Sequence, residues 1–234
     1  MADYAEMSKI LVESLGLTYE PVAVTLIAKG QNIPEGYAQP EKPIRHCQAI
    51  MRARHGESLV VTPDKQACPV GASSLGLTPI PAKVECGEFH FNMGMYASEE
   101  AAKNTIRQRP ALETGSMIAV AVSPLSKAKI EPHVVVITGT PEQVFWLLPA
   151  ASTFSIGGRV TVDMAAIQAS CADSTVLPYL TGKVNISLGC FGCRKTTDIA
   201  PEHMLVGIPM PKMQEIVSAV DKMRTGPIPK SRAK

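Results

Sequence analysis

The sequence predicts an α/β fold: a single mixed α/β domain in which helices surround a mostly central sheet. Apolar runs typical of buried strands alternate along the chain with stretches that carry apolar residues at helical spacing. No shift in composition marks a linker, and 234 residues are enough for one large domain. We therefore expect one cysteine-containing domain over residues 1–224, followed by a flexible basic tail over residues 225–234.

The N-terminal half of the chain shows both patterns. The first expected helix carries an apolar stripe and ends at Gly16, a typical stop residue. Strands are indicated by short runs of Val, Ile and Leu. Ser98 is placed to cap a later helix, with Glu99 and Glu100 in its first turn. In chain order, we expect a helix over residues 4–14, a strand over 21–27, a helix over 45–54, a strand over 58–62, a helix over 68–76 and a helix over 97–108.

The C-terminal half supplies the remaining strands. Two strong apolar runs come first, and Pro141 then occupies the favoured first position of a helix. Small residues at helical spacing precede Cys171, whereas no clear helix follows Cys190. In chain order, we expect strands over residues 117–122 and 133–138, helices over 141–148 and 162–171, strands over 184–188 and 204–208, and a helix over 212–223.

Charge and hydropathy exclude several classes of protein. The net charge is +2, and four of the 23 basic residues lie in the last eleven positions, so the nearly neutral body predicts no nucleic-acid partner. The N-terminus lacks the basic region of a secretory signal, and the longest apolar runs fall far short of the roughly 18 residues that a membrane span needs. We therefore expect a cytoplasmic protein that uses no membrane. In a reducing compartment its six cysteines indicate ligands or catalysts rather than disulfides.

The strongest local motif is a pair of thiols two residues apart, in Gly189-Cys190-Phe191-Gly192-Cys193-Arg194-Lys195. Such a pair can reach one metal ion or one cluster, and the flanking glycines let the backbone fold around it. The neighbouring cations would lower thiolate pKa values and offset the charge of a cluster. By itself the motif indicates a zinc half-site, a corner of a cluster or a redox dithiol, and the three readings stay open.

The other cysteines are dispersed, which favours a site assembled by tertiary folding over a small zinc finger. Cys47 and Cys68 each stand at an expected helix start, where free N–H groups stabilise sulfur ligands. Cys171 lies among small residues that allow close approach, whereas Cys86 reads as a filler of the core or its edge. We therefore predict an iron–sulfur cluster, with 4Fe–4S favoured and zinc as the alternative, at Cys47, Cys68, Cys171, Cys190 and Cys193.

Polar residues next to the expected ligands predict a functional pocket. They could bind a small anionic substrate or tune the potential of a cluster, and the competing interpretation is a solvated charged rim. We expect a redox role, as an electron carrier with a partner protein or as an iron–sulfur oxidoreductase. The alternative is a non-enzymatic module that is stabilised by zinc or senses metal or redox state, and the chain could form a homo-oligomer. The pocket residues are Arg45, His46, Arg52, Asp173, Arg194 and Lys195.

Short motifs spread over nearly the whole chain form a specific set. They are Leu15-Gly16-Leu17 with Pro21-Val22-Ala23-Val24, Cys47-Gln48 with Ala53-Arg54-His55-Gly56, Cys68-Pro69-Val70-Gly71-Ala72 with Leu75-Gly76-Leu77, Ser123-Pro124-Leu125, Pro141-Glu142-Gln143, Cys171-Ala172-Asp173, Ser187-Leu188-Gly189-Cys190-Phe191-Gly192-Cys193-Arg194 and Val206-Gly207-Ile208-Pro209. The set resembles the uncharacterised family known as domain of unknown function 169, found in archaea and anaerobic bacteria.

This resemblance also bears on the thiols. It implies a cysteine at the positions of Cys47, Cys68, Cys171 and Cys190, and a looser requirement at Cys193. Four thiols are the number that a cubane cluster needs. Whether Cys171 or Cys193 is the fourth ligand stays open.

Overall fold

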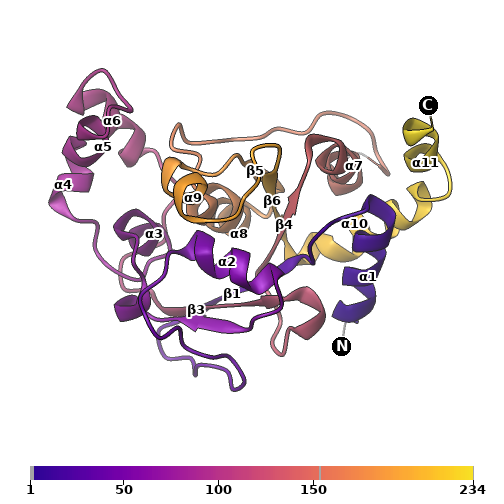
Figure 1. Ribbon diagram of the computed structural model, residues 1–234, viewed down its shortest axis with the longest axis horizontal. Helices are drawn as coiled ribbons and strands as arrows, with labels where there is room; N and C mark the ends of the chain where they lie inside the picture. Colours follow the sequence, from indigo (N-terminus) through magenta and orange to yellow (C-terminus); the bar gives the residue numbers. More distant parts are fainter. Residues whose placement is uncertain (1–2, 153, 234) are drawn as a thin grey trace.

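Six antiparallel strands form the centre of the computed structural model, which describes residues 3–152 and 154–233 (Figure 1). The strand order is β2-β3-β1-β4-β6-β5, so both outer strands are only three residues long. The predicted mixed α/β class is therefore confirmed, with a sheet that is antiparallel in each pairing. The strands are β1 (Val22–Ala28), β2 (Leu59–Val61), β3 (Met117–Pro124), β4 (Val134–Gly139), β5 (Asn185–Ser187) and β6 (Met204–Pro209).

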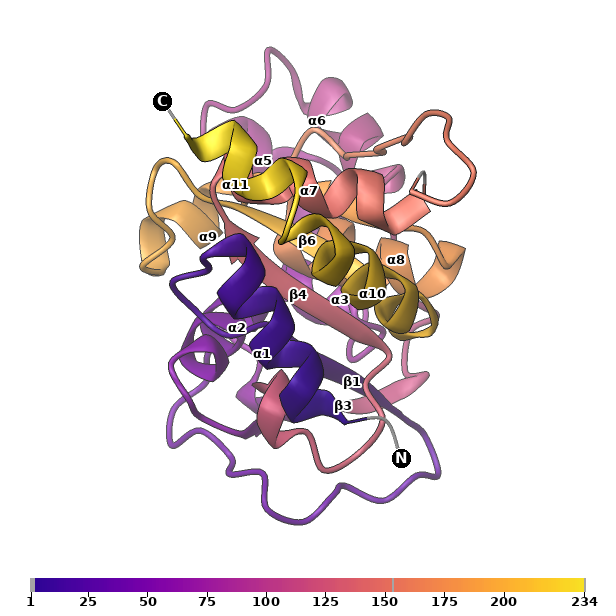
Figure 2. The same cartoon turned by 90° about the vertical axis from the view of Figure 1, so that its right-hand side faces the viewer.

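The alternation of side chains along β4 separates two cores. Val135 and Ile137 pack on the face that is covered by α1 (Tyr4–Leu15), α7 (Pro141–Ser152) and α10 (Met213–Met223), and Figure 2 shows α1 and α10 crossing this face. Val134 and Val136 point to the opposite face, where they pack with Cys47, Cys171 and Cys193. Because both faces of the sheet are covered, its strands read as nearly continuous apolar runs.

The cysteine-bearing face is covered by short helices. They include α2 (His46–Arg54), α3 (Pro69–Ser74) and α9 (Phe191–Thr196). A fourth helix begins at Ser170 and passes through a π-helical turn, η3 (Ala172–Val176), into α8 (Leu177–Thr181). It lies directly on β6, because a Cβ at Gly207 would collide with the carbonyl oxygen of Ser174. The close approach of this helix to the sheet thus depends on a glycine.

A helical arm extends from this face at one end of the molecule, beside α3 and α9 (Figure 1). It consists of α4 (Ala82–Glu85), α5 (Glu88–Asn92) and α6 (Glu99–Arg107), which pack on one another. Ser98 caps α6 as predicted, since its hydroxyl oxygen accepts a hydrogen bond of 3.1 Å from the amide of Ala101. The shorter helices α4 and α5 were not predicted. Single turns of 3-10 helix lie at η1 (Pro63–Lys65), η2 (Leu125–Lys127) and η4 (Met210–Lys212).

The helix expected over residues 162–171 is wrong. Residues 161–165 form no regular element, and Gln168 adopts a left-handed φ of 51° just before the helix begins. Side-chain bonds hold this segment open: Asn185 donates to the carbonyl of Asp163 at 2.7 Å, and Asp173 accepts from the amide of Ala165 at 3.1 Å. Tertiary hydrogen bonds thus override a pattern of small residues that resembles a helix.

The C-terminal residues carry one more helix. The region 225–234, expected as a flexible basic tail, contains α11 (Pro227–Arg232). Ile228 is buried there, and Arg232 pairs with Glu142 at 3.0 Å. None of the helices in the described part of the chain has the length and apolar character that a bilayer crossing needs.

Candidate metal centre

Five of the six cysteines gather on one face of the sheet, from segments far apart in sequence. Cys68, Cys171 and Cys190 line a cavity of about 260 Å³, and Cys47 and Cys193 are buried in the core cluster against which Cys68 and Cys190 pack. These are the five thiols predicted as ligands. Cys86 lies apart and exposed at the end of α4, where its thiol points to the carbonyl oxygen of Lys83.

The thiols of Cys190 and Cys193 are held together by α9. Cys190 is the N-cap of this helix, and its sulfur accepts a hydrogen bond of 3.4 Å from the amide of Cys193. The two sulfur atoms lie 3.3 Å apart. This helix was not predicted, because its six residues include a glycine and are too few to show periodicity. A thiol pair at the start of a helix that follows a strand is the arrangement of a thioredoxin-like redox dithiol, and α9 follows β5 in this way.

Cys193 is the acceptor at the centre of the group. Hydrogen bonds from Cys190, Cys47 and Ser170 hold the pKa of its thiol well below the usual range, although burial opposes this. The hydroxyl of Ser170 lies 3.4 Å from its sulfur. Donation to Cys193, reinforced by burial, raises the pKa of both Cys190 and Cys47. Cys193 is therefore the member of this trio that ionises first.

Cys68 and Cys171 form the other side of the group, across Gly71. Cys68 caps α3 as predicted, because its sulfur accepts from the amide of Gly71 at 3.4 Å. A Cβ at Gly71 would lie 3.7 Å from the sulfur of Cys171 and 3.8 Å from that of Cys68. Burial raises the pKa of Cys171, and the charges of Cys68 and Cys193 raise it further. A cation beside these sulfurs would favour their ionised forms.

The π-helical turn η3 supplies buried polar groups behind the thiols. Thr175 bonds His46 through its hydroxyl, 2.9 Å from Nε2, and burial lowers the pKa of His46 to about 4. Asp173 is fully buried, and burial raises its pKa to about 7. π-Helical turns of this kind occur frequently at functional sites. Both predicted residues therefore lie near the thiols, with His46 in its neutral form at pH 7.

The four predicted cations separate into two groups. Arg45 and Lys195 line the cavity. Arg194 instead donates to the backbone carbonyls of Leu188, Ala200 and His203, at 2.6 to 2.7 Å, and so fixes the loops around the thiol pair. Arg52 pairs with Glu57 on the surface. The structure thus leaves two of the four cations facing the cavity.

The arm supplies residues that the sequence analysis missed. Phe89, His90, Met93 and Met95 line the cavity from α5 and the turn after it. His90 is buried, its pKa is lowered by that burial, and its Nδ1 has no partner within the described part of the chain. No periodic pattern marks these residues, although a Phe- and Met-rich stretch in a chain with few aromatics was an available signal.

Among residues 3–152 and 154–233, no three His, Cys, Asp or Glu side chains are placed so that they could hold a metal ion. The donor set nevertheless suits an iron–sulfur cluster, because such clusters are held by cysteine thiolates. Three of the five thiols also border a cavity lined by Arg45 and Lys195, whose charges would offset that of the thiolates. The residues present therefore fit a cluster in chemistry.

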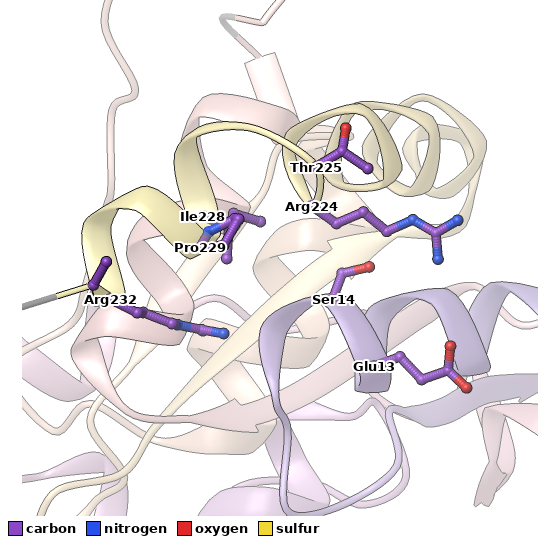
Figure 3. Close-up of a pocket in the computed structure, with 8 residues that line it drawn as sticks. Glu13, Ser14, Arg224, Thr225, Ile228, Pro229 and Arg232 are labelled. Carbon is purple, nitrogen blue, oxygen red and sulfur yellow. The ribbon is translucent and has the colours of Figure 1, made fainter.

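A larger depression of about 550 Å³ lies between α1 and α11 (Figure 3). Glu13 and Ser14 line it from α1, and Arg224, Ile228 and Arg232 line it from the C-terminal helices. Its cations already have acidic partners: Arg224 pairs with Asp221, and Arg232 with Glu142. The depression carries no thiol and offers less free charge than the cavity beside the cysteines.

Comparison with known proteins gives two matches. The family model DUF169, described as an uncharacterised ArCR, matches residues 10–219. An uncharacterised protein of Methanocaldococcus jannaschii is 34% identical over 221 residues, which cover 94% of each chain. No solved structure shows a significant match.

Proposed function

The chain belongs to the uncharacterised DUF169 family, and from that premise we propose that it binds an iron–sulfur cluster, with a 4Fe–4S cluster favoured, through the thiols around its cavity. One observation carries the proposal: five of six cysteines, from segments between residues 47 and 193, meet at one place. Core packing alone gives no reason for thiols to gather in this way.

The surroundings of the thiols support the same proposal. Cys68 and Cys190 each cap a helix, so backbone N–H groups already point at their sulfur atoms. Arg45 and Lys195 supply positive charge at the cavity. The ligands would come from Cys47, Cys68, Cys171, Cys190 and Cys193, with Asp173 and His46 behind them.

A bound cluster would supply one-electron chemistry. We therefore propose a redox role in the cytoplasm, either as an electron carrier with a partner protein or as an oxidoreductase acting on a small molecule. The cavity favours the second role, because three of the thiols border a space open to a small ligand.

Protein purified without oxygen is expected to be brown and to contain iron and acid-labile sulfide in equal amounts. Elemental analysis together with visible and electron paramagnetic resonance spectra would measure this. Colourless protein with one stoichiometric zinc would overturn the cluster and support a zinc-stabilised module in its place.

The 3.3 Å separation of the Cys190 and Cys193 sulfurs favours a second candidate, a thiol-based redox sensor. In this role the two thiols pass two electrons and two protons to a low-molecular-weight disulfide, which becomes two thiols while Cys190 and Cys193 form a disulfide. The half-exposed Cys190 would attack after passing its proton to the Cys193 thiolate, to which it already donates a hydrogen bond. The leaving glutathione thiolate would take that proton, and the buried Cys193 would then resolve the mixed disulfide.

Metal-free protein treated with oxidised glutathione is expected to lose about 2 Da and to yield a crosslinked Cys190–Cys193 peptide in mass spectrometry. In Cys193→Ser protein the reaction should instead stop at a mixed disulfide with glutathione on Cys190. A crosslink between other cysteines, or an unreactive wild-type protein, would contradict the sensor role.

A further inference from the structure

Two cations, Arg45 and Lys195, line the cavity. No acidic side chain in the described ranges pairs with Arg45 or Lys195. No described Asp or Glu lines the cavity either. Arg45 reaches over α9, where a Cβ at Gly192 would lie 2.5 Å from its Nη1 atom. Glycine at this position therefore leaves room for a guanidinium group beside Cys190.

Large apolar side chains line the same cavity as these two cations. Phe89, Met93 and Met95 line the cavity, and each leaves more than a third of its surface exposed. Phe191, also exposed, adds a second aromatic ring from α9. Large apolar side chains are seldom left in a group at a surface unless something packs on them. Methionine is suited to such a role, since its unbranched side chain adapts to ligands of different shape.

A third observation comes from His90. This side chain lines the cavity with 6% of its surface exposed, and its Nδ1 has no hydrogen-bond partner among the described residues. Buried polar atoms normally have a partner, so the unpaired Nδ1 of this wall residue is hydrogen-bonding capacity that no described residue uses. The imidazole can donate or accept through it, according to its tautomer.

We propose that this cavity binds a small organic anion with an apolar body, whose charged group is held by Arg45 and Lys195 and whose body lies against Phe89, Met93 and Met95. The proposal deepens the function proposed above, because it names a substrate class for the same site. A volume of about 260 Å³ lies just below the range for drug-sized ligands and suits a small one. Binding of the anion by the reduced, metal-free protein does not depend on the cluster.

The test uses four probes on reduced, metal-free, full-length protein. Hexanoate and 3-phenylpropionate carry both features, hexanamide lacks the charge, and acetate lacks the apolar body. Titration followed by ¹H–¹⁵N spectra should give saturable shifts for the two larger carboxylates, at residues 89–95 and at Lys195. Hexanamide and acetate should each bind at least about tenfold more weakly than hexanoate. Bound hexanoate should also protect Cys68 and Cys190 from iodoacetamide.

Matched variants locate the charge. Arg45→Gln and Lys195→Gln should each weaken hexanoate about tenfold, whereas Arg107→Gln, on the exposed surface of α6, should leave binding unchanged. Equal binding of hexanamide and hexanoate, or no saturable binding of either larger carboxylate, would overturn the proposal. Protein that binds hexanoate but incorporates no iron would remove the metal centre and keep the anion site. Protein that holds iron and binds no carboxylate would keep the metal centre and overturn the anion site.

Discussion

Replacing Cys190 with serine is expected to abolish metal incorporation, so that anaerobically prepared protein holds less than about a tenth of the wild-type iron. The same loss of iron is expected for Cys47→Ser, Cys68→Ser and Cys171→Ser. The reason is that a missing thiolate leaves an open iron site and an unbalanced charge beside the buried thiols. Iron and sulfide analysis would measure the effect, with circular dichroism to verify folding.

Cys86→Ser provides the matched control. Its thiol is exposed at the end of α4, outside the group of five, so iron content should equal that of the wild type. Full iron retention in both Cys47→Ser and Cys68→Ser would defeat the four-thiol arrangement. The site would then have to be rebuilt around Cys190 and Cys193.

The second large effect is expected from Gly207→Ala. A methyl group at this position of β6 would collide with the carbonyl oxygen of Ser174 and approach the ring of Pro178. The π-helical turn must therefore move away from the sheet, at a cost of about 3 kcal/mol in the free energy of unfolding. Because Cys171 immediately precedes that turn, its thiol should also react faster with iodoacetamide. Urea denaturation and alkylation kinetics measure the two effects.

Gly139→Ala is the control for this substitution. Gly139 also lies in a strand, but the atom nearest to an added methyl group there is the side-chain oxygen of Gln143, at 3.1 Å, which would have to shift by only a few tenths of an ångström. The expected change is below about 1 kcal/mol. Equal stability losses in the two variants would show that a strand glycine, rather than its contact with Ser174, is what matters.

The sheet could be predicted from the sequence because each strand is buried on both faces. Residues 117–122 and 134–137 are apolar without interruption, and the strands expected over 117–122 and 133–138 end within two residues of the bounds of β3 and β4. The helices that could not be predicted are short and defined by tertiary contacts. In α9 the capping atom is a thiol sulfur, and Phe89 in α5 and Met93 just after it line a cavity instead of a core.

The candidate site also contains features that the sequence predicts and features that it does not. The position of Cys68 at a helix start follows from the proline after it and is confirmed. The role of Arg194 could not be foreseen, because its three acceptors are backbone carbonyls of loops whose paths the sequence does not reveal. Arg52 was predicted as a pocket residue because it is close to Cys47 in sequence. In the structure, α2 directs its side chain toward Glu57 instead.

The lengths of the outer strands have a consequence for how copies of the chain can meet. β2 and β5 each offer only three residues, and the backbone beside β2 is already engaged by Ala38, which bridges to Leu59. Short, partly covered edge strands of this kind disfavour pairing between the sheets of two molecules. Self-association through cross-β ribbons is therefore not expected, and contacts between copies would have to use the helical faces.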